Sequence, residues 1–182
     1  LHKSSHSFPT RRSSDLGPYR MSVAMRAPAA QGGPWPVVFV SHGTGGSVLG
    51  HADLAAGLAR AGNVVVALEH PGDNYRDRSL VGDARYFSER PAQLLAVMRA
   101  VLDGEGAAGA AARSLMGDLS IDAKAIALLG HSAGGFTAAV VAGARADRGR
   151  VAEHCAAHAS ADPMCALADP NWGQVIRGFA PT

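Results

Sequence analysis

The sequence predicts an α/β domain with a mostly parallel sheet and helices on both faces. Two observations carry this prediction. Apolar strand-like runs alternate with helical patterns, which is typical of right-handed βαβ units. One of these runs also leads through a G-x-S-x-G turn directly into an Ala-rich helix. At 182 residues the chain is long enough for one domain with a sizeable core.

The expected strands are apolar runs, and one alternating run is an expected antiparallel or edge strand. In chain order they are 19–26 (the alternating run), 37–40 as a central parallel strand, 64–68 and 125–129 as buried strands, and 175–181. Helices are predicted over 49–59, from Pro91 to 102, over 136–142 and over 151–158. Between them, most of residues 75–89 is expected to be a solvated excursion, and residues 104–112 are expected to be irregular.

The N-terminal segment, residues 1–16, is set apart from the domain. His6–Leu16 matches the translation of a common sequencing-library adapter, so we interpret residues 1–16 as an artefact and expect them to be disordered. Residues 17–182 are then the N-terminal and central part of one domain. We expect this domain to be truncated at both ends, with its C-terminal strands missing.

Charge excludes several classes of partner. The formal net charge of +2 comes from the N-terminal segment, and without it basic and acidic residues are equal in number. A neutral chain gives no reason to expect nucleic acid or an anionic membrane. No apolar run is long enough to span a bilayer. No cofactor is predicted, and the oligomeric state stays open.

The G-x-S-x-G turn predicts a nucleophile, Ser132, in a sharp strained bend above the sheet. Gly130 and Gly134 remove side chains that would collide with neighbouring backbone. The next residue, Ala133, opens the following helix, so its N–H is expected to face a developing oxyanion. His131, inside the turn, is interpreted as a packing and hydrogen-bonding residue.

A second Gly-rich loop follows the strand at 37–40 and supplies the other half of an oxyanion hole. Its residues are His42, Gly43, Thr44, Gly45 and Gly46. Glycines let backbone donors approach a substrate closely, and Thr44 is the predicted donor. His42 and His70, at the ends of two strands, are expected to hold loops, and Asp73 to cap or orient the loop after His70.

Four sequence stretches resemble a known family. VSHGTGGS (40–47) and GHSAGG (130–135), with EHPGDN (69–74) and ERPAQLLAVMRAVLD (89–103) between them, are similar to α/β-hydrolases of the platelet-activating-factor acetylhydrolase and predicted dienelactone hydrolase type. The resemblance runs from about Pro36 to Phe136. It implies the α/β-hydrolase fold and a serine esterase that acts on short acyl or lactone-like esters without a metal. Dienelactone hydrolases proper use a cysteine nucleophile, whereas this chain has Ser132.

The general base and its acid are the missing parts of the expected triad, which in this fold follow the nucleophile. The acids after Ser132 are Asp147, Glu153, Asp162 and Asp169, and the histidines are His154 and His158. They crowd into one short segment beside the helix that follows Ser132, which is a poor position for a base. We therefore expect the base and acid to lie outside this chain, and the fragment to be nearly inactive.

The two cysteines, Cys155 and Cys165, leave three interpretations open. A local disulfide would favour an exported or periplasmic protein over a cytoplasmic one. Two free buried thiols are the second interpretation. A metal site with His154 and His158 is the third and least favoured, because its spacing matches no common zinc pattern.

Two other functions compete with ester hydrolysis. The Gly43–Gly46 loop lies between a strand and a helix, and Glu69 ends the next strand, as in a dinucleotide-binding Rossmann-like module. The third glycine of that fingerprint would fall at Val48, which argues against it. The other alternative is a catalytically dead α/β-hydrolase scaffold used for binding.

Overall fold

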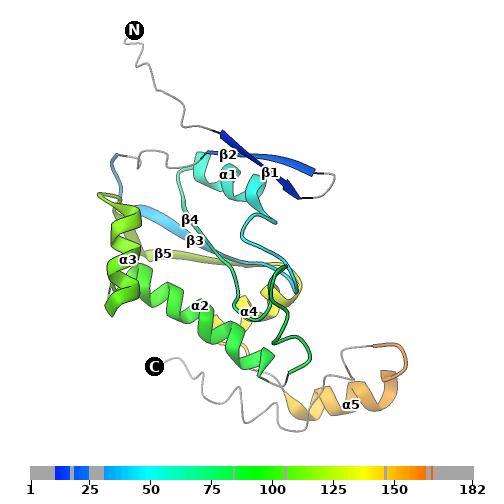
Figure 1. Ribbon diagram of the computed structural model, residues 1–182. Helices are drawn as coiled ribbons and strands as arrows, with labels where there is room; N and C mark the ends of the chain where they lie inside the picture. The colour runs from blue at the N-terminus through cyan, green and yellow to red at the C-terminus, as the bar shows by residue number, and fades with distance from the viewer. Residues whose placement is uncertain are drawn as a thin grey trace.

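The computed structural model describes residues 11–16, 19–24, 31–83, 85–104, 106–145, 147–162 and 165. Its centre is a three-stranded parallel sheet in the order β4-β3-β5 (Figure 1). The strands are β3 (Trp35–Ser41), β4 (Val64–Leu68) and β5 (Ile121–Gly130). β3 is central, as its wholly apolar sequence predicted, and its residues Val37–Ser41 are all buried.

Helices cover both faces of this sheet. Helix α1 (Ala52–Arg60) lies on one side, and α2 (Tyr86–Leu102) and α4 (Ala133–Val141) lie on the other (Figure 1). Val37 and Phe39 of β3 and Leu94 of α2 form the centre of the core on that second side. Because strand side chains alternate, Val38 and Val40 face the opposite side, where they are also buried. The predicted α/β arrangement is therefore present in the described residues.

Helix α2 begins earlier than predicted. The expected start was Pro91, but the helix starts at Tyr86 and Pro91 lies inside it. Burial explains the extra turn: Tyr86 and Phe87 are both almost fully buried, and the Phe87 ring packs edge-on against Phe136 of α4, with centroids 5.4 Å apart. Most of the described residues in 75–89 are exposed, as expected, while Tyr86 and Phe87 are buried because their aromatic rings join the core.

Two further segments differ from the predictions. The stretch expected to be irregular contains α3 (Gly106–Met116), since its alanines have the highest helix propensity. Strand β5 is longer than predicted and is not fully buried, because it lies at the edge of the described sheet, where Ile126 is 39% exposed. β4, the other edge strand, is only half-buried except at Leu68.

A separate two-stranded antiparallel sheet precedes the core. It pairs β1 (Arg11–Leu16) with β2 (Tyr19–Ala24), in the register Leu16↔Tyr19. The predicted antiparallel strand is therefore present over its described part. The expectation of disorder is wrong for Arg11–Leu16, because the backbone of this segment pairs with β2 along its whole length. The adapter origin of residues 1–16 stays a prediction.

Helix α5 (Arg148–His158) ends the described part and extends away from the sheet (Figure 1). Its N-cap is Asp147, whose side chain accepts a hydrogen bond from the Arg150 N–H. Among the described residues, none of the helices has the length and apolarity needed to cross a bilayer. Three predictions lie outside the described residues: the strand over 175–181, the candidate acid Asp169, and the two ends of the expected domain 17–182.

Candidate active site

The strand–turn–helix around Ser132 has the geometry of a strained bend. β5 ends at Gly130, and Ser132 is the N-cap of α4, with φ 53° and ψ −120°. Among described residues other than glycine, Ser132 alone has a positive φ. Such a conformation costs free energy and persists only where the surroundings enforce it. The Ser132 side chain is exposed, so the bend presents a hydroxyl to solvent.

Close backbone packing explains the glycines on either side of Ser132. A Cβ at Gly130 would lie 2.0 Å from the carbonyl oxygen of Gly134, and a Cβ at Gly134 would lie 2.0 Å from that of Ser41. Both contacts are with backbone, which cannot rotate away as a side chain can. The sequence argument for Gly130 and Gly134 was therefore sterically sound, and strand β3 supplies the second contact.

The Gly-rich loop after β3 lies directly beside Ser132. A Cβ built at Gly43 would be 3.3 Å from the Ser132 Cβ and 3.1 Å from Nδ1 of His131. Gly46 also needs to be small, since its Cβ would lie 2.9 Å from the Gly43 carbonyl oxygen. The two motifs, far apart in sequence, thus meet where β3 and β5 end.

Several backbone amides at this junction are unpaired. Within the described residues, the N–H groups of Thr44 and Ala133 donate no hydrogen bond, and neither do those of the preceding residues Gly43 and Ser132. The neighbouring loop amides are already occupied, because Gly45 N–H donates to Asp73 Oδ1 at 2.8 Å and Gly46 N–H donates to the Gly43 carbonyl at 3.0 Å. Free donors beside an exposed hydroxyl are what an oxyanion hole requires.

A buried ion pair lies beneath the loop. The side chains of Asp73 and Arg90 are both fully buried and form a salt bridge. Arg90 also donates to the His42 carbonyl and, at 3.2 Å, to Thr137 Oγ1 of α4. Sequence reasoning missed Arg90. The available signal was its spacing, since it precedes Leu94 by four residues and so falls on the apolar face of α2.

His70 and His42 form a second buried chain of hydrogen bonds. His70 Nδ1 lies 2.7 Å from Gln93 Oε1 and Nε2 lies 2.8 Å from Ser41 Oγ, while its backbone N–H donates to His42 Nε2 at 3.1 Å. His42 Nδ1 lies 2.7 Å from the Gly43 carbonyl. In His42 these partners require the neutral Nδ1–H tautomer, because Nε2 accepts the His70 N–H. In His70 the same tautomer satisfies Gln93 Oε1 at Nδ1 and lets Nε2 accept the Ser41 hydroxyl.

The electrostatics agree with neutral histidines. Burial, together with the nearby Arg90 guanidinium, lowers the pKa of His70 to about 4. Burial likewise lowers the pKa of His42. Both side chains are tied to the loop residues they adjoin, in keeping with the expectation that they hold loops.

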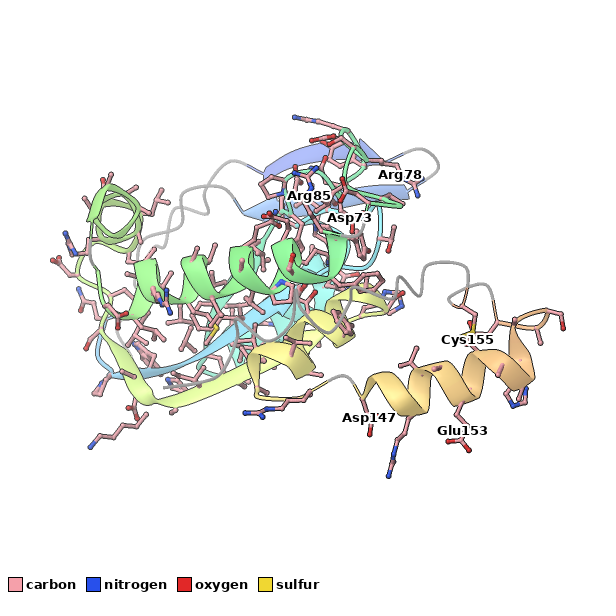
Figure 2. All side chains as sticks on the ribbon, turned by 90° about the horizontal axis from the view of Figure 1, so that it is seen from below. Asp73, Arg78, Arg85, Asp147, Glu153 and Cys155 are labelled. Carbon is pink, nitrogen blue, oxygen red and sulfur yellow. A yellow bond between two sulfur atoms is a disulfide. The ribbon has the colours of Figure 1, made fainter. Side chains whose placement is uncertain are left out.

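No described histidine side chain hydrogen-bonds to the Ser132 hydroxyl. His131 is exposed, and its ring meets that of His51 edge-on, with centroids 5.6 Å apart. Asp147, the N-cap of α5, and Glu153 within it point outward in Figure 2, on the far side of the molecule from Asp73. These two acids therefore lie away from Asp73 and the loop that it holds.

Cys155 and Cys165 are joined by a disulfide, with Cα atoms 5.4 Å apart. Of the three interpretations left open by the sequence, the structure contains this one. The ligand atoms of His154, Asp162 and Cys165 lie within 4.8 Å of one another, and His154 Nε2 is 3.0 Å from Asp162 Oδ2. The Cys165 sulfur is already bonded to Cys155, which leaves this cluster without a free thiolate.

The parallel sheet flanked by helices defines an α/β protein. Its candidate site lies at the carboxyl edge of the sheet, where two strands end in Gly-rich turns beside an exposed serine. A family model, platelet-activating factor acetylhydrolase, isoform II, matches residues 3–99, and the chain belongs to this family. The family is one of α/β-hydrolases, which indicates a hydrolase with a small-molecule substrate. Searches of the curated proteins and of the solved structures found no match.

The matched range covers the loop at 42–46, Asp73 and Arg90, and ends before Ser132. The family match and the geometry of the bend are thus independent observations. The range matched by the family model also includes residues 3–16, which belong to the segment interpreted above as adapter sequence.

Proposed function

We propose that this site hydrolyses short acyl or lactone-like esters through an acyl-enzyme on Ser132. In the first step Ser132 Oγ attacks the ester carbonyl carbon and loses its proton to a general base. The carbonyl oxygen becomes an oxyanion that accepts hydrogen bonds from the Thr44 and Ala133 amides. The alcohol then leaves with a proton, and water releases the acyl group as a carboxylic acid.

The observation that supports this proposal best is the pair of unpaired amides beside an exposed, strained serine. A strained conformation at a non-glycine residue is expected where function requires it. The free amides could stabilise the negative charge that develops on the substrate oxygen when Ser132 attacks. The family match supports the hydrolase class independently.

The Rossmann-like alternative fits the loop poorly. A pyrophosphate would need the amides of this loop, but Gly45 N–H is bound to the Asp73 carboxylate and Gly46 N–H to a carbonyl. A buried carboxylate next to the loop would also repel phosphate. We therefore favour an ester substrate over a dinucleotide.

The general base is expected outside the described histidines, because none of them forms a hydrogen bond with the Ser132 hydroxyl. We accordingly expect this chain alone to be acylated slowly and to turn over poorly. An oxyanion hole keeps a residual rate enhancement of roughly 10³–10⁴ when triad members are removed, so acylation should still be measurable.

The test is p-nitrophenyl acetate with the wild-type chain and with Ser132→Ala, following p-nitrophenolate release and intact mass. We expect an acetyl adduct on Ser132 in the wild type and none in the variant. Fast Ser132-dependent turnover would contradict the expected absence of the base. A wild type without any adduct, also unlabelled by a fluorophosphonate, would favour the dead scaffold.

A further inference from the structure

The two amides proposed to form the oxyanion hole come from different elements, and something must hold them at a fixed separation. Thr44 belongs to the loop after β3, whereas Ala133 opens α4. An oxyanion hole works only when both donors reach the same atom, about 2.7–3.1 Å away. The loop itself is irregular, so its position depends on side chains that contact it.

One contact acts on Thr44 directly. Thr44 Oγ1 and Tyr86 Oη share a hydrogen bond of 2.6 Å. Tyr86 opens α2 and is only 8% exposed, and burial raises the pKa of its phenol, so the hydroxyl stays protonated at neutral pH. Its neighbour Phe87 packs on Phe136, and both Phe136 and Ala133 pack against the same cluster. Tyr86 thus joins the loop to the start of α4.

A second set of contacts links the loop to α4 through buried groups. Asp73 holds Gly45 N–H on one carboxylate oxygen and pairs with Arg90 on the other. Arg90 donates to Thr137 Oγ1, which in turn donates to the Ala133 carbonyl at 2.9 Å. A continuous chain of hydrogen bonds therefore connects the residue after Thr44 with Ala133 itself.

The same chain also decides which loop amide is free. Because Asp73 takes the Gly45 N–H and the Gly43 carbonyl takes the Gly46 N–H, the free amides of the 43–46 loop are those of Gly43 and Thr44. Without Asp73 the Gly45 amide would compete for the same position. The buried pair is costly to desolvate, and this role gives a physical reason to retain it.

We propose that Tyr86, Asp73 and Arg90 are positioning residues that set the separation of the Thr44 and Ala133 amides and thereby the strength of the oxyanion hole. The proposal rests on the function proposed above. None of the three touches the reacting atoms; each acts through the loop or through α4. They come from the loop after β4 and from the start of α2, and Figure 2 shows Asp73 close to that end of α2.

The sharpest variant is Tyr86→Phe, because it removes one oxygen and keeps the buried ring. Its matched control is Tyr75→Phe, since Tyr75 is 49% exposed and its hydroxyl has no hydrogen bond within the described residues. Thr137→Val is a second variant that breaks the chain at α4 and keeps the side-chain shape.

The first readout is acylation of Ser132 in the full chain by p-nitrophenyl acetate, measured as a function of ester concentration. We expect Tyr86→Phe to lower the acylation rate constant about tenfold, which is less than the 10²–10³ lost with a whole donor. The ester concentration for half-maximal rate should stay unchanged, because the donors act on the tetrahedral oxyanion. Tyr75→Phe should equal the wild type, and Thr137→Val should resemble Tyr86→Phe.

The second readout is amide hydrogen exchange, which needs no activity. We expect Gly45 and Gly46 to exchange about fivefold faster in Tyr86→Phe than in Tyr75→Phe, while β3 is unchanged. Unchanged loop exchange, or a change in the half-maximal concentration alone, would overturn the positioning role. If the wild type forms no adduct but loop exchange responds, the proposed function fails and the structural link stands.

Discussion

Two adjacent glycines at the start of α4 should respond oppositely to the same substitution. Helix propensity alone predicts that Gly→Ala stabilises a helix by about 0.5–1 kcal/mol. At Gly135 the new Cβ would have its nearest neighbour, the Gly130 carbonyl oxygen, at 3.5 Å, so Gly135→Ala should show this gain. At Gly134 the new Cβ would lie 2.0 Å from the Ser41 carbonyl oxygen and 2.8 Å from that of His42.

The magnitude at Gly134 follows from what must move. The 2.0 Å contact has to open to at least 3.4 Å, and both partners are backbone at the end of the central strand β3. Overpacking a core costs about 1–3 kcal/mol when side chains absorb it. Here none can, so we expect Gly134→Ala to cost at least about 3 kcal/mol, a large part of the roughly 5–15 kcal/mol that stabilises a domain.

Urea unfolding followed by circular dichroism measures both variants against the wild type. We expect the midpoint to rise slightly for Gly135→Ala and to fall steeply for Gly134→Ala, which in the extreme would not fold. Equal unfolding free energies for the two variants would refute the steric account of the bend.

Three other predictions concern the buried polar groups and the strained serine. Arg90→Met should lower the free energy of unfolding in urea by about 3–5 kcal/mol, because it leaves the fully buried Asp73 carboxylate unpaired. The double variant with Asp73→Asn should lose less unfolding free energy than the sum of the two single variants. Burial and the nearby Arg90 lower the pKa of His70 from 6.5 to about 4, so the unfolded chain takes up a proton before the folded chain does as the pH falls. The free energy of unfolding should therefore fall by roughly 3 kcal/mol as the pH is lowered from 6.5 to about 4. A pH profile that stays equally steep in His70→Gln would contradict this. Ser132→Gly should raise the free energy of unfolding by about 1 kcal/mol, since glycine accepts φ 53° without strain, while the acetyl adduct disappears; a less stable variant would argue against strain.

Local patterns in the sequence predicted the strands β3 and β4, helices α1 and α4 and the bend at Ser132. Each of these depends on a short window of residues: apolar runs, helical spacing, or two glycines around a serine. The steric need for Gly130 is itself local, because its partner Gly134 lies within the same turn. Where the controlling contacts are close in sequence, the sequence alone was sufficient.

Tertiary structure decided the remainder. The start of α2 depends on burial of Tyr86 and Phe87 against α4, and the exposure of β5 depends on its place at the edge of the described sheet. The Asp73–Arg90 pair joins residues from two elements and reaches the loop and α4 only after the sheet has formed. A short sequence window records a residue's own preferences and not which distant carboxylate it will meet. The sequence could place Arg90 on the apolar face of α2, but its partner Asp73 became visible only in the assembled fold.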